Sequence, residues 1–379
     1  MANRNFNLFS DQQLSECKPA LDRITIDSTL ETMQRTSSWK RTLFRWLGIT
    51  NEPTVKVYHG YGRPDLLIIQ GHVLNISPLK FTTTRRNVLA NTFALLRLFI
   101  TRSYSNATVQ LLGQITDAPI QVRTDKDGFF RLQYTPDIPF PPGWHQLDVA
   151  LMTGPTPNDT ILASGIGQVY VPHPTQYACV SDIDDTFLIS HSATVLKRLK
   201  VLLTQNAYSR QPFKDVVRHY QLLAYAGTEQ HAPNAFFYVS SSEWNLYEYI
   251  MTFSRENGLP KGIYLLNQLK RLHQVLKSGQ NKHTTKFTRI ARLLEIYPHL
   301  KFILLGDDTQ EDPAIYASLV GHFPNQIICV YLRRVHAAHQ AQTQTFIDQI
   351  EAAGVSCCYF THSDEAIRHS QQIGLVAAN

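Results

Sequence analysis

The chain has 379 residues, of which 43% are hydrophobic and 17% are charged, so its length suits two domains and its composition suits a folded globular protein. No apolar run is long enough to cross a bilayer, and the first ten residues lack the apolar core of a secretory signal, so we expect a cytoplasmic protein. The net charge of +6 favours an anionic partner; without a nucleic-acid-binding motif, nucleic acid is not expected.

Residues 1–52 form a first region of mixed composition, in which the pattern predicts a helix over residues 29–47. The end of this helix places Trp46 close to Lys40 and Arg41. Aromatic residues beside basic ones suit a membrane interface, and they also suit a helix that docks onto the next region, which is the preferred interpretation. A peripheral contact with a membrane surface is therefore one of two interpretations of this segment.

Residues 53–175 form a second region, and their pattern predicts mostly strands. Short runs rich in β-branched and aromatic residues alternate with turns that contain glycine or proline. The predicted strands are residues 55–60, 66–74, 119–123, 129–134, 144–152 and 165–171. The Asp127-Gly128 turn predicts a hairpin between the third and fourth of them, and a helix is predicted over residues 87–100. We expect a small β-sandwich-like domain with an inserted helix.

Residues 176–379 form a third region, in which short apolar strands alternate with helical patterns. The predicted strands are residues 177–181, 235–240, 302–306, 326–332 and 357–360. The predicted helices between them are residues 244–257, 286–297, 314–322 and 342–353. Such alternation gives a parallel sheet with helices on both faces, so the expected fold class is α/β.

Polar residues follow three of these strands at the point where each strand ends. They are Asp182 and Asp184 after the first strand, Ser240 and Ser241 after the second, and Asp307 and Asp312 after the third. Lys286 begins the helix that precedes the third of these strands. Ligands of open α/β sheets sit at the carboxyl ends of the strands, so we expect these residues to converge on one crevice.

The residue types in this crevice suit phosphoryl transfer. A carboxylate such as Asp182 can attack phosphorus and form an aspartyl-phosphate. Asp184 can protonate the leaving oxygen and later activate water. The hydroxyl of Ser240 and the ammonium of Lys286 would hold the phosphoryl oxygens. Each motif alone also fits an ordinary turn or helix cap, so the prediction depends on all of them occurring in this order.

Several carboxylates at one edge of a sheet also predict a divalent cation. Mg²⁺ prefers oxygen ligands, reduces the repulsion between carboxylates and neutralises the charge of a phosphate. We expect Asp182 and Asp307 to bind it through side-chain oxygens and Asp184 through its carbonyl. Asp312 would complete or orient this metal site, or orient Lys286.

The motifs resemble those of the haloacid dehalogenase superfamily, and the match is closer to one of its branches. The segments Asp182–Thr186, Asn206–Phe213 and Phe237–Tyr247 are similar to the catalytic domain of the actin-patch phosphatidate phosphatase family, which also occurs in many bacterial proteins. The resemblance covers roughly residues 53–375. It implies a Rossmann-like sheet and a Mg²⁺-dependent phosphatase that cleaves phosphatidate, a lipid phosphomonoester, to diacylglycerol.

Carried over residue by residue, the resemblance implies Asp182 as nucleophile, Asp184 as acid/base, Ser240 and Lys286 as phosphate ligands, and Asp307 as metal ligand. The sequence departs from the family in three places. Glu243 stands where the family usually has proline, Asp308-Thr309 replaces Ser-Gly, and Asn267-Gln268 replaces Arg-Asp. Lys282 is a rival of Lys286 for the phosphate-binding role, and Lys286 is preferred for its spacing from the helix that follows.

The substrate is less well defined than the chemistry. Arg210 and Ser241 are the predicted substrate-binding residues, and Arg210 follows a basic run at residues 196–200. Three hypotheses remain open: a lipid phosphatase at a membrane surface, a phosphatase of a soluble phosphomonoester with the same mechanism, and a non-catalytic interaction scaffold. Asp182, Asp184 and Asp307 occurring together argue against the scaffold.

Overall fold

The computed structural model describes residues 49–50, 52–78, 102–113, 118–156, 159–173, 177–183, 215–229, 231–267, 282–309 and 311–377. The chain divides into two compact units, residues 1–51 and residues 52–379. Strand β1 (Ile49–Thr50) is the described part of the first unit. The helices predicted over residues 29–47 and 87–100 lie outside the described residues.

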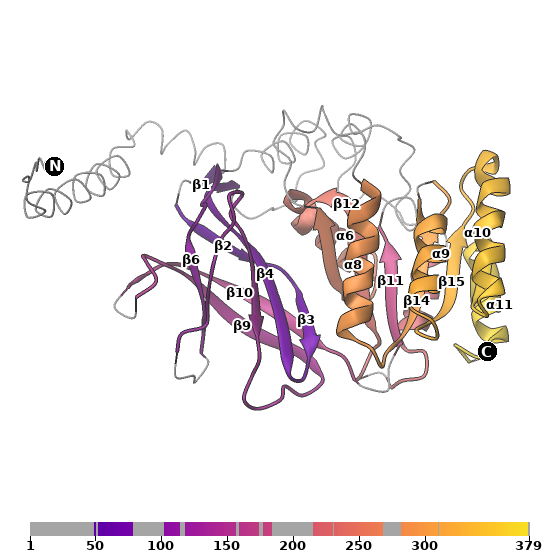
Figure 1. Ribbon diagram of the computed structural model, residues 1–379, viewed down its shortest axis with the longest axis horizontal. Coiled ribbons are helices and arrows are strands. Elements are labelled where there is room, and N and C mark those ends of the chain that lie inside the picture. The colour runs from indigo at the N-terminus through magenta and orange to yellow at the C-terminus, as the bar shows by residue number, and fades with distance from the viewer. Residues whose placement is uncertain are drawn as a thin grey trace, which may run out of the picture. The chain divides into compact units, whose positions relative to one another are not determined.

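The second unit begins with a β region of nine described strands (Figure 1). Their bounds are β2 (Thr54–Val57), β3 (Gly60–Arg63), β4 (Leu66–Pro78), β5 (Arg102–Ser103), β6 (Thr108–Leu112), β7 (Gln121–Arg123), β8 (Phe129–Tyr134), β9 (Gly143–Met152) and β10 (Ile161–Val171). The strands pair in the order β4-β3-β10-β9-β6-β7, and β2, β5 and β8 also pair with β4. The sheet is antiparallel apart from the pairing of β3 with β10, and it encloses a core that includes Val109, Leu132 and Val149.

The hairpin predicted around Asp127-Gly128 is only partly correct. The chain does turn there: the N–H of Gly128 donates to the carbonyl of Asp125 at 3.0 Å, and Gly128 has a φ of +79°. The Asp125 carboxylate accepts the N–H groups of Asp127 and Phe129, both at 2.9 Å. The flanking strands pair elsewhere, β7 with β6 and β8 with β4. The turn is closed by its own hydrogen bonds, so it needs no ladder between its two strands.

The α/β region that follows contains one parallel sheet. Its strands are β11 (Tyr177–Asp182), β12 (Ala235–Glu243), β13 (Ile263–Asn267), β14 (Lys301–Asp307), β15 (Ile327–Arg333) and β16 (Ser356–Phe360). They lie in the order β13-β12-β11-β14-β15-β16, and each neighbouring pair is parallel. The chain therefore winds from β11 in the middle to one edge and then to the other. This confirms the predicted α/β class with a parallel sheet.

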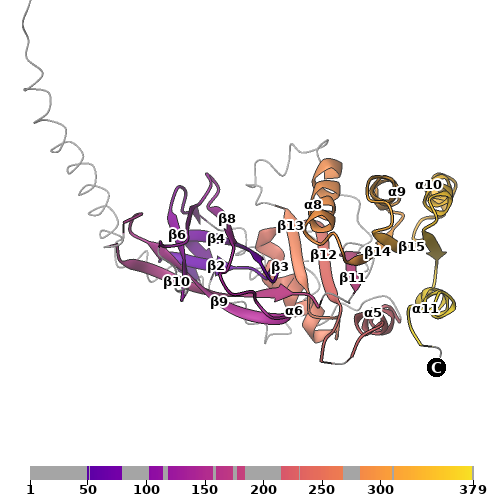
Figure 2. The same ribbon diagram turned by 60° about the horizontal axis from the view of Figure 1, so that its bottom comes forward.

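Helices cover both faces of this sheet (Figure 2). Helices α8 (Lys282–Ile296), α9 (Asp312–His322) and α10 (Gln340–Ala352) lie on one face, and α5 (Val216–Ala224), α6 (Tyr247–Glu256) and α11 (Ser363–Gln372) on the other. Short 3₁₀ turns, η1 (Trp244–Leu246) and η2 (Ala337–His339), precede α6 and α10. Each face has its own buried core, which explains why the strands are apolar on both sides. None of the helices in the described ranges has the length and apolar character needed to cross a membrane.

The β region and the α/β region share buried side chains. Tyr58 stacks on Trp244 with ring centroids 4.1 Å apart, and the backbone N–H of His59 donates to the Tyr247 hydroxyl at 2.9 Å. The His59 ring is hydrogen-bonded through Nδ1 to the carbonyl of Gly262 at 2.8 Å. These contacts join β2 and β3 to the segment from η1 to β13. The boundary predicted at residue 175 falls between β10 and β11, and the division into three domains remains a prediction.

Candidate active site

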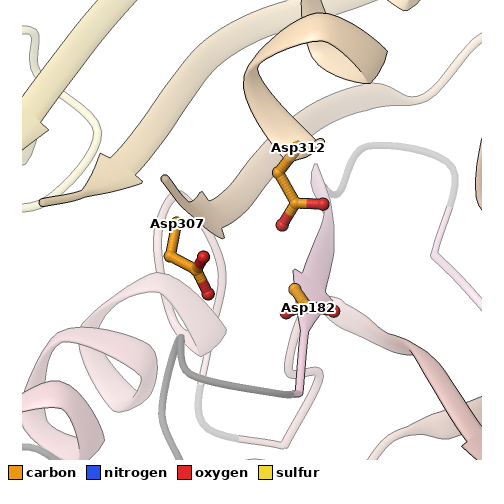
Figure 3. A group of neighbouring side chains, drawn as sticks. All are labelled: Asp182, Asp307 and Asp312. Carbon is orange, nitrogen blue, oxygen red and sulfur yellow. The ribbon is translucent and has the colours of Figure 1, made fainter. Parts of the chain in front are cut away.

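Three buried carboxylates meet at the carboxyl edge of the parallel sheet. Asp182 is the last residue of β11, Asp307 is the last residue of β14, and Asp312 is the first residue of α9. Strands β11 and β14 are parallel neighbours, so their ends lie side by side. Figure 3 shows the three carboxylates facing a common point, and each offers an oxygen within 4.8 Å of the others. We refer to these three residues as the acidic cluster.

Lys286 lies against the acidic cluster from helix α8. Its Nζ donates to Oδ1 of Asp182 at 2.8 Å and also to Oδ1 of Asp312. Burial alone would lower the pKa of this ammonium, but the charges of Asp182 and Asp312 outweigh burial and raise the pKa above its ordinary value. Lys286 therefore stays charged and balances one of the three carboxylates.

Asp307 experiences the remaining excess of negative charge. Burial is the main cause that raises the pKa of its carboxyl group, and the charge of Asp312 raises it further. Thr309 opposes this shift, since its N–H and its hydroxyl donate to Oδ1 of Asp307 at 2.6 Å and 2.5 Å. The acidic cluster is thus an electrostatically unfavourable arrangement that a bound cation would relieve.

The residues of the acidic cluster fit a Mg²⁺ ion. Their donor atoms are carboxylate oxygens, the ligands that Mg²⁺ prefers. Oδ2 of Asp312 is buried, and within the described part of the chain it has no hydrogen-bond partner, which is costly for a carboxylate oxygen unless a ligand completes it. Gly306 makes this position possible, because a Cβ there would lie 2.5 Å from that same oxygen.

Ser240 lies beside Asp182 on the neighbouring strand. Asp182 pairs with Val239 across β11 and β12, so Ser240 is the next residue beyond the end of that pairing. The register between β12 and β13 shifts from Val239–Leu265 to Glu243–Asn267, so four steps on β12 match two on β13. Residues 240–242 therefore form a bulge, and the buried Oγ of Ser240 accepts the N–H of Ser242 at 2.9 Å. We refer to residues 240–242 as the serine bulge.

The structure brings together only some of the residues that the sequence predicts. Asp182, Asp307, Asp312 and Lys286 are in contact, and Ser240 is adjacent to them along the sheet edge. Asp184 and Arg210 lie outside the described residues, so their roles remain predictions. The same holds for the side chains of Ser241 and Lys282, whose backbones belong to β12 and α8.

Asp308 differs from the family pattern and faces away from the cluster. Its carboxylate accepts the N–H of Val335 at 2.8 Å and the hydroxyl of Tyr359 at 2.7 Å. These contacts tie the end of β14 to the segment after β15 and to β16. Asp308 therefore holds neighbouring backbone in place, and it does so beside Asp307 without adding a fourth carboxylate to the acidic cluster.

Sequence reasoning missed one charged residue near the serine bulge. Arg289 of α8 donates from Nη1 to the carbonyl of Ser240 at 3.0 Å. The available signal was helical spacing, because Arg289 follows Lys286 by three residues and so lies on the same side of the helix. Nothing in the motif itself singles out that position.

The match to a known family lies within the α/β region. Residues 177–334 match the family model described as phosphatidate phosphatase APP1, catalytic domain. Phosphatidate phosphatase APP1 of Saccharomyces cerevisiae is 29% identical over 161 residues, which are 42% of this chain and 26% of that protein. An uncharacterized protein of Schizosaccharomyces pombe is 23% identical over 234 residues, 60% of this chain and 37% of that protein. The chain thus spans well under half the length of these curated relatives.

Among solved structures, a point mutant of the PilB minor pilin from Streptococcus sanguinis aligns over 92% of this chain and 98% of its own, with 12% identity. Its TM-score of 0.28 is too low to relate the two folds. The family match, in contrast, begins at the strand that ends in Asp182 and includes Ser240, Lys286, Asp307 and Asp312. Over residues 177–334, which are less than half of the chain, the sequence matches the model of the phosphatidate phosphatase APP1 catalytic domain and is therefore similar to that family.

Proposed function

We propose that the chain is a Mg²⁺-dependent phosphomonoester phosphatase of the haloacid dehalogenase type, acting through an aspartyl-phosphate on Asp182. The observation that carries this proposal is the contact of buried Lys286 with both Asp182 and Asp312 at the carboxyl edge of a doubly wound sheet. A buried carboxylate at the end of the central strand, held by an ammonium group, is suitably placed to act as a nucleophile.

Each residue has a defined task in the proposed reaction. An oxygen of Asp182 forms a bond to phosphorus while the bond from phosphorus to the leaving oxygen breaks, and Asp184 gives that oxygen a proton. Water then attacks phosphorus, Asp184 takes up its proton, and the carboxylate of Asp182 is restored. Ser240 and Lys286 hold the phosphoryl oxygens, and Lys286 also balances the charge of Asp182.

The proposed metal ligands are Asp182, Asp307 and Asp312, with the carbonyl of Asp184 as a further predicted ligand. When bound, Mg²⁺ supplies positive charge that lowers the repulsion between the carboxylates and the phosphate. Asp307 is suited to this task because Thr309 holds its Oδ1 through two hydrogen bonds. In addition, burial and the charge of Asp312 raise the pKa of its carboxyl group, and a bound cation would counteract both effects.

Phosphatidate is the proposed substrate class, by similarity to the relative from Saccharomyces cerevisiae. The net charge of +6 suits an anionic substrate, whether a lipid or a soluble ester. Arg210 and Ser241 are the proposed substrate contacts. A soluble phosphomonoester cleaved by the same residues is the alternative, since the substrate-contact residues are assigned from sequence alone.

The first test measures inorganic phosphate released with Mg²⁺ from phosphatidate in mixed micelles, beside a panel of soluble phosphomonoesters. Asp182→Asn serves as the blank, because this nearly isosteric change removes the nucleophile and leaves the fold intact. Release from phosphatidate alone supports a lipid phosphatase, and release only from soluble esters moves the proposal to the alternative. If Asp182→Asn kept the wild-type rate, Asp182 would not be the nucleophile.

Metal dependence needs a separate test. EDTA should abolish turnover and added Mg²⁺ should restore it. In the absence of substrate, Mg²⁺ should raise the melting temperature of the wild type but not that of Asp312→Asn, because ligand binding stabilises the folded state only where the site is complete. Turnover that survives EDTA would contradict the proposed metal dependence.

We also propose a cytoplasmic enzyme that contacts membranes peripherally. Anionic vesicles should bind the wild type at low salt and release it at high salt, and replacing Lys40 and Arg41 together should weaken binding. Neutral vesicles provide the control. A protein that ignores anionic vesicles while hydrolysing soluble esters would favour the soluble-substrate alternative.

A further inference from the structure

Arg289 lies on the same helix as Lys286 and reaches a different part of the site. The two residues are three positions apart on α8, so their side chains leave the helix on one side. Lys286 contacts the acidic cluster, whereas Arg289 points to the ends of β12 and β13. Lys286 and Arg289 of α8 therefore have separate partners.

The guanidinium of Arg289 joins three backbone and side-chain oxygens at the serine bulge. Nη1 donates to the carbonyl of Ser240 at 3.0 Å and to the carbonyl of Leu265 at 3.4 Å. Nη2 donates to the side-chain oxygen of Asn267. Leu265 and Asn267 belong to β13, and their pairings with Val239 and Glu243 flank the register shift that creates the bulge. Arg289 thus spans the gap between the two strands where regular pairing is interrupted.

The position of Arg289 also has an electrostatic cost. The side chain is half-buried, and burial followed by the charge of Arg292 lowers its pKa to about 10. A lysine or an apolar residue would avoid part of this cost only by losing hydrogen bonds, since the planar guanidinium offers several donors in a fixed arrangement. The contacts with three oxygens give a reason for an arginine at this position.

Resting on the function proposed above, we propose that Arg289 is a positioning residue that fixes the serine bulge relative to Lys286, so that the Ser240 hydroxyl and the Lys286 ammonium are presented together to a phosphate group. Arg289 acts through the carbonyl of Ser240, not through direct contact with the substrate. Asn267, which departs from the family pattern, becomes part of this arrangement because it accepts from the same guanidinium.

The test compares Arg289→Met with Arg292→Met in the full chain. Arg292 lies on the same helix and is exposed, so its replacement removes the same charge and a similar volume without touching the bulge. Arg289→Met should raise both KM and the inhibition constant of inorganic phosphate by about tenfold to a hundredfold, the effect of losing charge-assisted hydrogen bonds. Arg292→Met should leave both within about twofold.

Two further variants separate positioning from folding. Arg289→Lys keeps the charge but not the fork of donors, and it should recover only part of the phosphate affinity. Asn267→Ala removes one acceptor and leaves the arginine in place, so it should weaken phosphate inhibition less than Arg289→Met does. Melting temperatures identify any variant that is simply unfolded, and the comparison then uses Arg289→Lys and Asn267→Ala.

The outcomes distinguish this inference from the proposed function. If the wild type hydrolyses an ester and is inhibited by phosphate while folded Arg289→Met behaves like Arg292→Met, the positioning role is wrong and the phosphatase proposal stands. If Arg289→Lys matches the wild type in every constant, charge alone is sufficient and the positioning role is also wrong. A wild type that neither hydrolyses phosphate esters nor binds phosphate rejects both.

Discussion

Asp312 shows how much a single side chain can constrain its surroundings. Asp312 is the first residue of helix α9, and its Oδ1 accepts a hydrogen bond from Lys286. Its Oδ2 is buried and has no hydrogen-bond partner among the described residues. The space for this carboxylate exists because residue 306 has no side chain. The glycine of the Gly306-Asp307 motif is thus needed for close packing.

Gly306→Ala should damage metal binding before it damages the fold. The added Cβ would lie 2.5 Å from Oδ2 of Asp312 and 2.8 Å from Cε2 of Tyr316, so the carboxylate must move. We expect a loss of about 1–3 kcal/mol in the free energy of unfolding, the usual cost of overpacking, and at least a tenfold loss of Mg²⁺ affinity. Urea unfolding and a Mg²⁺ titration of the melting temperature measure the two effects.

Gly321→Ala is the matched control for this change. Gly321 lies on α9 near its end, and a Cβ there would meet nothing within 4 Å. The substitution should stabilise the helix by up to about 1 kcal/mol because alanine favours helix more than glycine does. Equal effects of the two substitutions on Mg²⁺ affinity would show that the contact between a Cβ at residue 306 and Asp312 does not weaken Mg²⁺ binding.

Among the elements, helix α5 depends on an uncharged histidine. His219 is buried, its Nε2 is hydrogen-bonded to the Ser370 hydroxyl at 2.9 Å, and its ring meets Tyr331 edge-on at 4.9 Å. Burial, and next the charge of Arg333, lowers the pKa of His219 to about 3. The contact joins α5 to α11 and β15, and burial there favours the neutral form of the imidazole.

This arrangement predicts a loss of stability in acid. The unfolded chain protonates His219 near pH 6.5, whereas the folded chain holds it neutral down to about pH 3, so the unfolded state binds more protons between these values. The stabilisation is therefore fully present above pH 6.5 and decreases as the pH falls, by up to about 1.4 kcal/mol per pH unit. Between pH 7.5 and pH 5.0 this residue should account for up to about 2 kcal/mol.

Urea unfolding at the two pH values, for the wild type and for His219→Gln, measures that contribution. The variant should lose less free energy of unfolding than the wild type when the pH is lowered. His231→Gln is the control, since the His231 side chain is 75% exposed and its replacement leaves the buried core untouched. An unchanged pH dependence in His219→Gln would mean that folding does not lower the pKa of His219.

The elements that the sequence predicts correctly have strong hydrophobic periodicity. All five predicted strands of the parallel sheet occur, with ends shifted by at most a few residues, since strands buried on both faces are apolar throughout. Among the described elements, the sequence did not predict α5, α11 and β13 of the α/β region or β5 and β6 of the β region. Helix α11 is largely polar, and β13 is five residues long, so local pattern alone did not distinguish either from a loop.

The whole second unit is held together by the aromatic contacts between its two regions. Tyr58 and Phe129 of the β region belong to the same buried core as Trp244, Tyr247 and Phe253 of the α/β region. Trp244 directly follows the segment that contains the serine bulge. Packing in the β region therefore supports backbone close to the candidate active site.

Tyr58→Ala should loosen a segment that is almost two hundred residues away in sequence. Loss of the ring that stacks on Trp244 should cost about 3 kcal/mol. Hydrogen–deuterium exchange should increase over residues 235–256 as well as around residue 58. Tyr225→Ala, at a residue 42% exposed, is the control and should cost less than about 1 kcal/mol. Exchange that increases only within the β region would show that the two regions unfold independently.

At the scale of the molecule, the sequence indicates which residues meet but not how they are held. The predicted convergence of Asp182, Asp307, Asp312 and Lys286 follows from strand order, and the structure has these side chains in contact. The roles of Arg289 and Tyr58 depend on contacts between distant segments, and no local pattern encodes them. Such tertiary contacts are the part of the site that propensity and periodicity do not determine.

The shared aromatic core also limits how this architecture can be divided and recombined. A fragment restricted to residues 177–334 would expose Trp244 and Tyr247 to water and would leave β15 without its neighbour β16, giving an open strand edge prone to aggregation. The unit that packs together is therefore larger than the stretch of this chain that matches the family model. Gene fusion or domain grafting that moves the segment from β2 to α11 as one block should preserve it, and cuts inside that block should not.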